Sequence, residues 1–219
     1  MLYDWRNFFL HLGQVPGIHL PVQFDYTQKK REAEENLRFL KENFIIERAG
    51  PPTYALQRED MLGAAELEVV AYHSDCVSTI GSSWAQRLSL EWNCEGCTGL
   101  RKASSGVNPL RPPDSEMPRP GSIFIERSGV TGRWALQLFS QYEAGEATAR
   151  EPQTRRLRWF RMCLEQVAKF MQEHGLLRLG LPLYVGCVTR TNREWLQYGK
   201  VLDEWHRGNA ALELTLYDC

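Results

Sequence analysis

The chain has 219 residues, of which 43% are apolar and 24% are charged, and its formal net charge is -1. These values are ordinary for a globular protein with one sizeable core, and the near-neutral charge argues against a general attraction to nucleic acid or acidic membranes. No apolar run approaches the roughly 18 residues needed to cross a bilayer, and the first residues lack the basic and apolar regions of a signal peptide.

Residues 1–48 are predicted to form an N-terminal extension, separate from a main domain over residues 49–219. Aromatic residues between Tyr3 and Phe9 predict that the extension packs against a surface rather than floating. A helix is expected from about Thr27 to Asn43, because apolar residues recur there at helical spacing between charged ones. This apolar stripe consists of Ala33, Leu37, Leu40 and Phe44.

From about Thr53 the pattern changes to strands that alternate with helices. The predicted strands are residues 53–56, 67–72, 122–126, 134–140, 179–185 and 211–217. The predicted helices are residues 82–92, a helix that Thr154 caps and Gly175 ends, and residues 192–206. Prolines between residues 93 and 121 predict a long surface loop. The alternation predicts an α/β fold with a largely parallel, helix-covered sheet and with ligands beyond the carboxyl ends of its strands.

Two loops that lead from a strand into a helix are candidates for binding phosphate. The first follows residues 67–73 and includes Ile80-Gly-Ser-Ser-Trp-Ala85, and the second follows residues 179–185 and leads to a helix near Trp195. Unpaired backbone N–H groups and the positive end of the helix dipole meet in such loops, and both attract phosphate. Two such loops in one small domain predict a ligand with two phosphates, although neither loop is rich enough in glycine to settle this alone.

Six cysteines at irregular positions do not suit the framework of a secreted disulfide-rich domain. We therefore expect a reduced, intracellular protein, either cytoplasmic or nuclear. Cys94 and Cys97 have the spacing of half a zinc site, but the sequence lacks the second close pair of Cys or His that such a site needs. Two incidental loop thiols are the favoured interpretation, and no metal or other cofactor is expected.

Seven segments resemble, in the right order, the motifs of one protein family. They are Tyr54–Leu62, Val69–His73, Gly81–Ala85, Pro120–Phe124, Leu136–Gln141, Leu181–Cys187 and Ala211–Tyr217. The family is that of the macrodomains, the ADP-ribose-binding α/β/α modules, and the small hydrolases that remove terminal ADP-ribose are its most similar subgroup. The resemblance covers roughly residues 50–219. It implies a macrodomain-like three-layer α/β/α sandwich with a mixed, mostly parallel sheet, and binding of ADP-ribose or of an ADP-ribosylated protein.

The resemblance and the two loops together give a set of candidate ligand-binding residues. They are Asp60, Cys76, Gly81, Ser82, Ser83, Gly186, Cys187, Val188, Thr189, Arg190 and Tyr217. The resemblance implies that Asp60 accepts a hydrogen bond from the adenine amino group, while a solvated turn is an equally good interpretation of this residue. Tyr217 either borders the adenine or packs in the core of the last strand, and the core position is favoured.

Other residues near the loops have two interpretations each. Arg190 and Arg193 either grip a phosphate directly or form an ordinary charged helix start, which is slightly favoured. His73 is interpreted as a satisfied histidine at a strand end rather than a catalytic base. Trp84 and Trp195 are predicted to be core residues of their helices.

The chain departs from the family pattern where catalysis is expected. The second loop is Gly186-Cys-Val-Thr-Arg-Thr-Asn192, whereas the family pattern continues Gly-Cys-Gly. Glycine permits close approach of the backbone to a phosphate and a positive φ, and Val188 and Thr189 resist both. The loop has no counterpart of the subgroup's catalytic Asp, Gln141 stands at its catalytic Lys, and Cys76 replaces an Asn or Ser. The catalytic residues therefore remain unassigned, and we expect hydrolysis to be absent or slow.

Two functions from different classes are compatible with these features. The leading hypothesis is binding of ADP-ribose or an ADP-ribosylated target in a macrodomain cleft, with at most weak ADP-ribosyl hydrolase activity. The alternative is a degenerate macrodomain that serves as a protein-interaction or structural module and does not bind ADP-ribose. Neither nucleic acid nor a membrane is expected as a partner.

Overall fold

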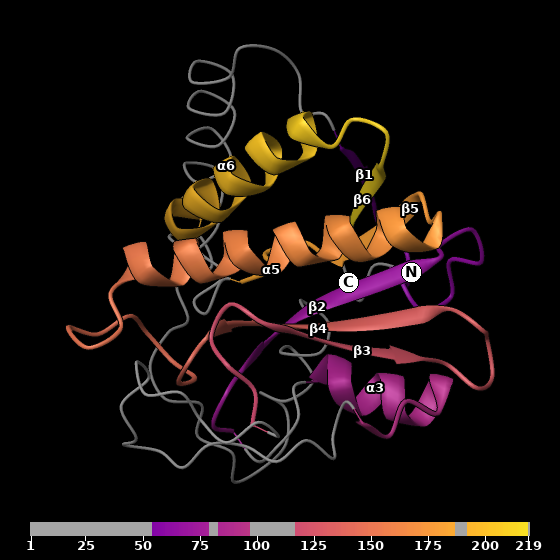
Figure 1. Cartoon of the computed structure of the whole chain (residues 1–219), viewed down its shortest axis with the longest axis horizontal. Coiled ribbons are helices and arrows are strands. Elements are labelled where there is room, and N and C mark those ends of the chain that lie inside the picture. The colour runs from indigo at the N-terminus through magenta and orange to yellow at the C-terminus, as the bar shows by residue number, and fades with distance from the viewer. Residues whose placement is uncertain (1–53, 79–82, 97–116, 187–191, 219) are drawn as a thin grey trace, which may run out of the picture. The chain divides into compact units, whose positions relative to one another are not determined.

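The computed structural model describes residues 54–78, 83–96, 117–186 and 192–218 (Figure 1). The predicted extension at residues 1–48, with its helix, lies outside the described residues. So does most of the predicted surface loop between residues 93 and 121.

The described residues contain one six-stranded sheet with the strand order β1-β6-β5-β2-β4-β3. The strands are β1 (Ala55–Gln57), β2 (Val69–Asp75), β3 (Ile123–Arg127), β4 (Trp134–Gln141), β5 (Arg178–Pro182) and β6 (Glu213–Tyr217). Every neighbouring pair is parallel except β3 and β4, so five strands run in the same direction. The chain leaves β2 toward β4 on one side and later returns to β5 on the other. Ligands of such sheets bind where the strand order reverses in this way, beyond the carboxyl ends of the strands.

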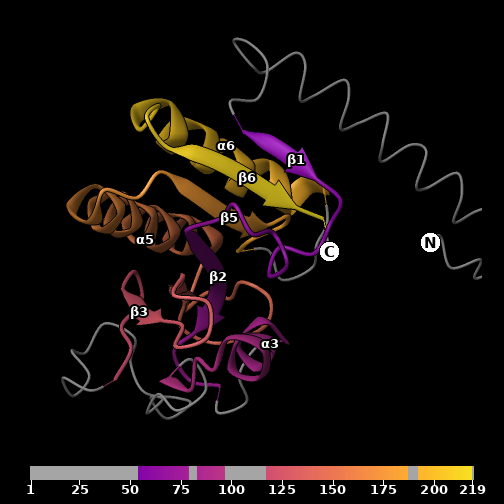
Figure 2. The same cartoon turned by 90° about the vertical axis from the view of Figure 1, so that its right-hand side faces the viewer.

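The helices of the described residues that cover the sheet are α3 (Ser83–Trp92), α5 (Gln153–His174) and α6 (Asn192–Gly208). Figure 2 shows α5 and α6 on one side of the sheet and α3 on the other. The predicted three-layer α/β/α sandwich with a mixed, mostly parallel sheet is therefore confirmed. None of the helices in the described ranges is long and apolar enough to cross a membrane.

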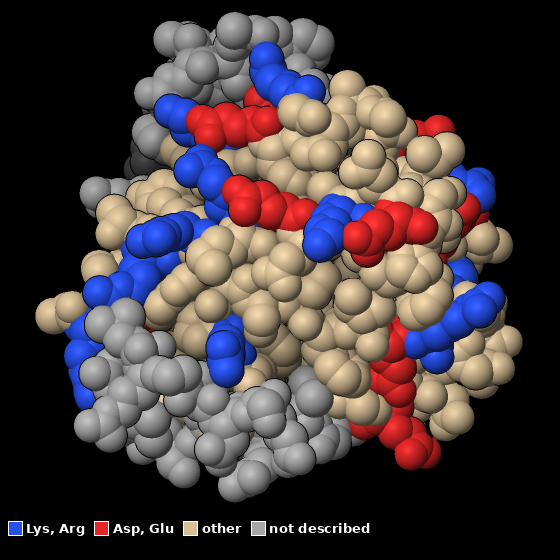
Figure 3. All heavy atoms as spheres, in the orientation of Figure 1, with Lys and Arg blue, Asp and Glu red and all other residues tan. Residues whose placement is uncertain are grey.

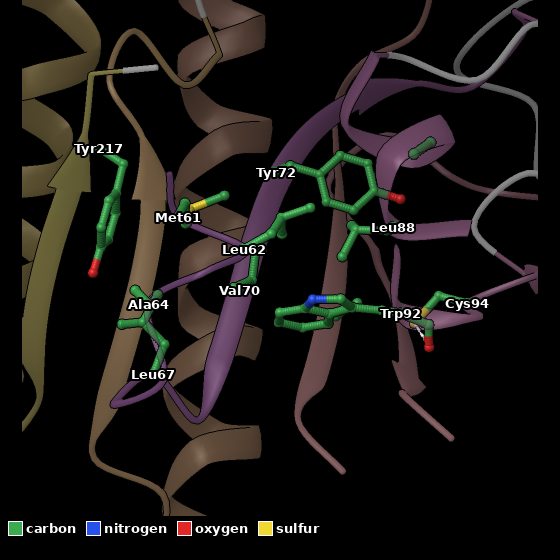
Figure 4. Packing of buried hydrophobic residues seen from close by; sticks show 12 residues of the cluster. Met61, Leu62, Ala64, Leu67, Val70, Tyr72, Leu88, Trp92, Cys94 and Tyr217 are labelled. Carbon is green, nitrogen blue, oxygen red and sulfur yellow. Dashed lines mark hydrogen bonds between the residues drawn. The ribbon is translucent and has the colours of Figure 1, made fainter. Parts of the chain in front are cut away.

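A cluster of buried apolar residues lies between α3 and the sheet (Figure 4). Leu88 and Trp92 of α3 meet Val70 and Tyr72 of β2, and the loop between β1 and β2 adds further apolar residues. This loop packs so closely on β5 that a Cβ at Gly180 would lie 2.5 Å from Leu67 Cδ1. Such close packing fixes the loop that begins with Asp60.

The strands and helices predicted within the described residues exist, with shifted bounds. The strand predicted at 179–185 ends at Pro182, because the chain turns there and Val185 N–H bonds back to the Pro182 carbonyl. The predicted cap at Thr154 is wrong. The N-cap of α5 is Pro152, which makes no side-chain cap bond, and Thr154 is the second residue of the helix. The predicted stop at Gly175 is confirmed, since this glycine has φ +64° and its N–H bonds to the last turn.

The exposed surface of α5 and α6 carries charges of both signs. On the face in Figure 3 acidic and basic side chains alternate along both helices. They include the ion pairs Arg161–Glu204 at 2.9 Å and Lys169–Glu173 at 3.8 Å. Basic side chains gather at the end where α5 begins, and the first turn of this helix has no acidic residue (Figure 3).

Candidate functional site

The carboxyl ends of β1, β6, β5, β2 and β4 meet at one edge of the sheet, which we call the carboxyl edge. The helices α3, α5 and α6 follow β2, β4 and β5 in the chain, so each helix begins near this edge. Backbone N–H groups at a helix start have no partners within the helix and carry a partial positive charge. Three such helix starts give the carboxyl edge the means to hold an anion.

The first predicted loop begins with a turn after β2. The Asp75 carboxylate accepts hydrogen bonds from the backbone N–H groups of Val77, at 2.9 Å, and Ser78. The Cys76 N–H donates to the Tyr142 carbonyl at 3.0 Å, which ties this loop to the end of β4. Gly81 and Ser82 lie outside the described residues, and Ser83 is exposed at the start of α3.

The Cys76 side chain does not reach the surface. It is 0% exposed and packs with Phe139, Tyr142 and Trp159. Because its backbone N–H already bonds to Tyr142, the structure favours a packing role for Cys76 over the ligand contact expected from the sequence. The register of β2 and β4 also shifts at this point, between Ser74 and Asp75.

His73 and Ser140 form a hydrogen bond across β2 and β4, with 2.6 Å between Nδ1 and Oγ. Ser140 is fully buried, whereas the His73 side chain is partly exposed. Burial in the sheet lowers the pKa of His73 to about 4, so its imidazole is neutral near pH 7. His73 thus lies near the end of β2, and Ser140 is the hydrogen-bond partner of its Nδ1.

Gln141, which the sequence resemblance aligned with a catalytic Lys, carries an amide. Gln141 is 4% exposed at the end of β4, and in the described part of the chain its Oε1 has no hydrogen-bond donor. An amide does not act as a base near neutral pH. A buried, unpaired acceptor costs about 1–3 kcal/mol unless water or a ligand reaches it. Gln141 therefore offers a hydrogen bond to the site but no acid–base chemistry.

The loop after β4 is fixed by a buried ion pair between Glu151 and Arg156, at 2.8 Å. Glu151 accepts hydrogen bonds from the N–H groups of Tyr142 and Glu143, at 3.0 and 3.1 Å. Arg156 donates to the carbonyls of Glu143, Gly145 and Glu146. Because the pair holds so many backbone groups, the loop has one defined position at the carboxyl edge. No pattern in the sequence predicts this pair.

Asp60 lies after β1, and its carboxylate accepts hydrogen bonds from Arg87 Nη2 at 2.8 and 3.0 Å and from Leu62 N–H at 3.3 Å. The Asp60 side chain is 50% exposed. The hydrogen bond from Arg87 holds the pKa of Asp60 below its usual value. A carboxylate has about four lone-pair positions, so Asp60 retains the capacity to accept one more bond from a ligand. Arg87 in turn bonds to Glu91 and lies 5.3 Å from the Trp84 ring centroid.

The second predicted loop begins with a residue that must be glycine. Gly186 has φ +84°, and a Cβ there would lie 2.5 Å from the Tyr198 ring. Tyr184 also has a positive φ, +63°, and its ring packs edge-on against Trp195, which is buried as predicted. Cys187, Val188, Thr189 and Arg190 lie outside the described residues, as does the side chain of Arg193.

Tyr217 faces away from the carboxyl edge. Its ring is 1% exposed within the core, and its hydroxyl points along the sheet toward the loop between Ala64 and Leu67 (Figure 4). The hydroxyl donates to Glu66 Oε1 at 3.4 Å. This position favours the core role over a contact with adenine.

The described residues contain no group of three or more His, Cys, Asp and Glu side chains that could hold a metal ion. Cys94 is buried in the core beside Trp92, and Cys97 lies outside the described residues.

Comparison with known proteins identifies the fold. No family model and no curated protein sequence matches this chain. Its structure is similar to the DarG macrodomain of Thermus aquaticus, with 14% identity and a TM-score of 0.52 over 76% of this chain and 98% of that one. The DarG macrodomain of Mycobacterium tuberculosis is also similar, with 14% identity and a TM-score of 0.54 over 76% of this chain and 97% of that one. A mutant Oceanobacillus iheyensis macrodomain with ADPR, the usual abbreviation of ADP-ribose, has 10% identity and a TM-score of 0.51 over 74% of this chain and 82% of that one. The chain therefore has the macrodomain fold.

Proposed function

We propose that this protein binds ADP-ribose, free or attached to a protein, at its carboxyl edge. The observation that carries the proposal is the macrodomain fold, together with the solved structure of a protein of this fold with ADPR. Two features of the chain itself support it. Three helices begin at the carboxyl edge, and Gly186 keeps the conformation that lets a backbone approach a phosphate closely.

The strand order predicts which part of the ligand would lie at which strand along the carboxyl edge. Asp60 follows β1, the second loop follows β5, and the first loop follows β2. With adenine at Asp60, the diphosphate would lie between the two loops and the terminal ribose beside β2 and β4. Basic residues in the first turns of α5, Arg155 and Arg158, add positive charge near the same edge.

Hydrolysis of an ADP-ribosyl bond is proposed to be absent or slow. Gln141 supplies no base, His73 is a weak base because burial lowers its pKa to about 4, and Cys76 is buried. Release of ADP-ribose from modified protein measures this directly, with Cys76→Ala and Asp75→Ala alongside. Robust turnover that either substitution abolishes would place an active site in the first loop.

The second candidate function is a protein-interaction module that does not bind ADP-ribose. Two observations favour it: Arg87 already binds the Asp60 carboxylate, and Val188 stands at a glycine position of the family pattern in the second loop. In that case the macrodomain fold would serve only as a scaffold.

Calorimetric titration of the full chain with ADP-ribose tests the two functions. Saturable binding with one site is expected, and ADP-ribose at 100 times its dissociation constant should stabilise the protein by about 2.7 kcal/mol in thermal unfolding. The absence of both heat and stabilisation at millimolar ADP-ribose would favour the interaction module.

We also propose that the protein is intracellular.

We further propose that residues 1–48 form an extension that packs through its apolar residues. Deletion of the extension should then lower the melting temperature or the solubility of residues 49–219. An unchanged melting temperature would show that the extension is a free tail.

A further inference from the structure

The hydrogen bond between His73 and Ser140 has a direction that the burial of the serine determines. Among the described residues, His73 Nδ1 is the only hydrogen-bond partner of the buried Ser140 hydroxyl. The hydroxyl hydrogen is best placed on this bond, because an unpaired donor in the interior is costly. Ser140 then donates to Nδ1, and the proton of the neutral ring is on Nε2.

No group among the described residues bonds to Nε2 of His73. The ring is partly exposed near the carboxyl edge, and within the described part of the chain its single hydrogen bond is the one to Ser140. Because the ring is neutral, Nε2 presents an N–H donor, which suits an oxygen acceptor.

The charges around the ring favour a neutral oxygen over a phosphate. Asp75 of β2 and Glu194 in the first turn of α6 are the acidic groups that act on His73, and Arg156 of α5 is the basic one. Because two carboxylates and only one guanidinium act on the ring, the local charge disfavours binding of a phosphate next to it. A sugar hydroxyl carries no charge and accepts from an N–H donor.

The strand order places this donor at one end of the ligand. β2 and β4 lie three and four strands from β1, which is roughly 14 and 19 Å at about 4.8 Å per strand. With adenine at Asp60, the opposite end of ADP-ribose, its terminal ribose, reaches this pair of strands.

We propose that His73 is a specificity-determining residue that donates from Nε2 to a hydroxyl oxygen of the terminal ribose, and that Ser140 is a positioning residue that fixes the ring. This inference rests on the proposed binding of ADP-ribose. The contact from His73 would distinguish ADP-ribose from ADP, because ADP lacks the terminal ribose.

Titrations of the full chain with ADP-ribose and with ADP test the ligand contact. The variant His73→Phe keeps an aromatic ring but removes both nitrogens. His174→Phe is the matched control at the far end of α5, where Nδ1 bonds to the Phe170 carbonyl. His73→Phe should weaken ADP-ribose roughly 2- to 10-fold and leave ADP unchanged, as expected for one hydrogen bond. His174→Phe should change neither affinity. Equal losses for both ligands, or none for either, would overturn the proposal.

The imidazole nitrogen shifts of the unliganded protein test the role of Ser140 independently. The expected His73 spectrum near pH 7 is that of a neutral ring protonated on Nε2, and Ser140→Ala should convert it toward a mixture of the two tautomers. A wild-type ring protonated on Nδ1 would contradict the assignment. If the wild type binds neither ligand, the proposed function and the sugar contact both fail, while the tautomer still decides the role of Ser140.

Discussion

The two ends of the carboxyl edge each carry an arginine–carboxylate pair, but the pairs differ in exposure and in what they hold. At the β1 end the side chains of Asp60 and Arg87 are 50% and 35% exposed. At the β4 end those of Glu151 and Arg156 are 5% and 2% exposed. The buried pair also binds two backbone amides and three backbone carbonyls.

This difference assigns different tasks to the two ends. An exposed ion pair contributes at most about 1 kcal/mol to stability, so a ligand can compete with it at low cost. A buried pair that loses one partner leaves an uncompensated charge in the interior, so it acts as part of the fold. The β4 end is therefore preorganised before any ligand arrives, whereas the β1 end can adjust.

The largest effect is expected from breaking the buried pair. Arg156→Ala should lower the free energy of unfolding by about 3–5 kcal/mol, because the Glu151 carboxylate remains buried without its cation. Urea denaturation measures the change, and Arg158→Ala, at an exposed position of the same helix, serves as the control. A loss of unfolding free energy below about 1 kcal/mol would show that the buried pair contributes no more than an exposed pair does.

Removal of both charges separates the contribution of the backbone hydrogen bonds from that of the ion pair. Apolar replacement of a buried pair is often neutral. Here the double variant Glu151→Leu with Arg156→Met should still lose at least about 2 kcal/mol, because the backbone groups of Glu143, Gly145 and Tyr142 lose their partners. Wild-type stability in the double variant would show that these backbone bonds contribute little.

Acid should destabilise the β2–β4 end through His73. Its pKa is about 4 in the folded protein and near 6.5 when unfolded, so the unfolded state binds the proton first as pH falls. Stability is therefore unaffected above about pH 6.5, falls between pH 6.5 and 4, and changes no further below that. The linked loss from pH 7 to pH 5 is about 2 kcal/mol. Denaturation at pH 7 and pH 5 measures this loss, and the His73→Phe variant should lose about that much less stability between the two pH values. An equal pH dependence of stability in the wild type and the variant would contradict the lowered pKa of His73.

The smallest effect on stability is expected at the exposed pair. Asp60→Ala should change the free energy of unfolding by at most about 1 kcal/mol. The same substitution should weaken ADP-ribose by one to two decades, since a hydrogen bond to a charged group contributes about 1.5–3 kcal/mol. Unfolding and calorimetric titration of one sample separate the two effects. Equal affinities of wild type and variant would remove Asp60 from the site.

The fold was predictable because its signals are local. Alternating strands and helices, the glycine stop at Gly175 and the buried position of Trp195 follow from residues close together in the sequence. The cap at Thr154 was predicted wrongly, because a threonine near a helix start is a common cap, whereas the turn ahead uses the Thr148 hydroxyl to bind Glu151 N–H.

The site was less predictable because its contacts join distant residues. His73 and Ser140 are 67 positions apart, and Arg87 is 27 positions from Asp60. No spacing rule connects a buried serine on one strand with a histidine on another. The side chain of Cys76 was expected at the ligand for its place in a motif, while its packing against Phe139 and Trp159 depends on the tertiary fold.

Backbone amide chemical shifts during a titration with ADP-ribose test the central claim most directly, because they locate the ligand on the molecule. We expect the largest changes at the carboxyl edge, around Asp60, the residues from Asp75 to Ser78, and Gly186. Residues at the opposite ends of the strands, such as Val69 and Trp134, should change little. An unchanged spectrum at millimolar ADP-ribose, or changes confined to the opposite edge, would contradict the claim that this macrodomain fold binds ADP-ribose at its carboxyl edge.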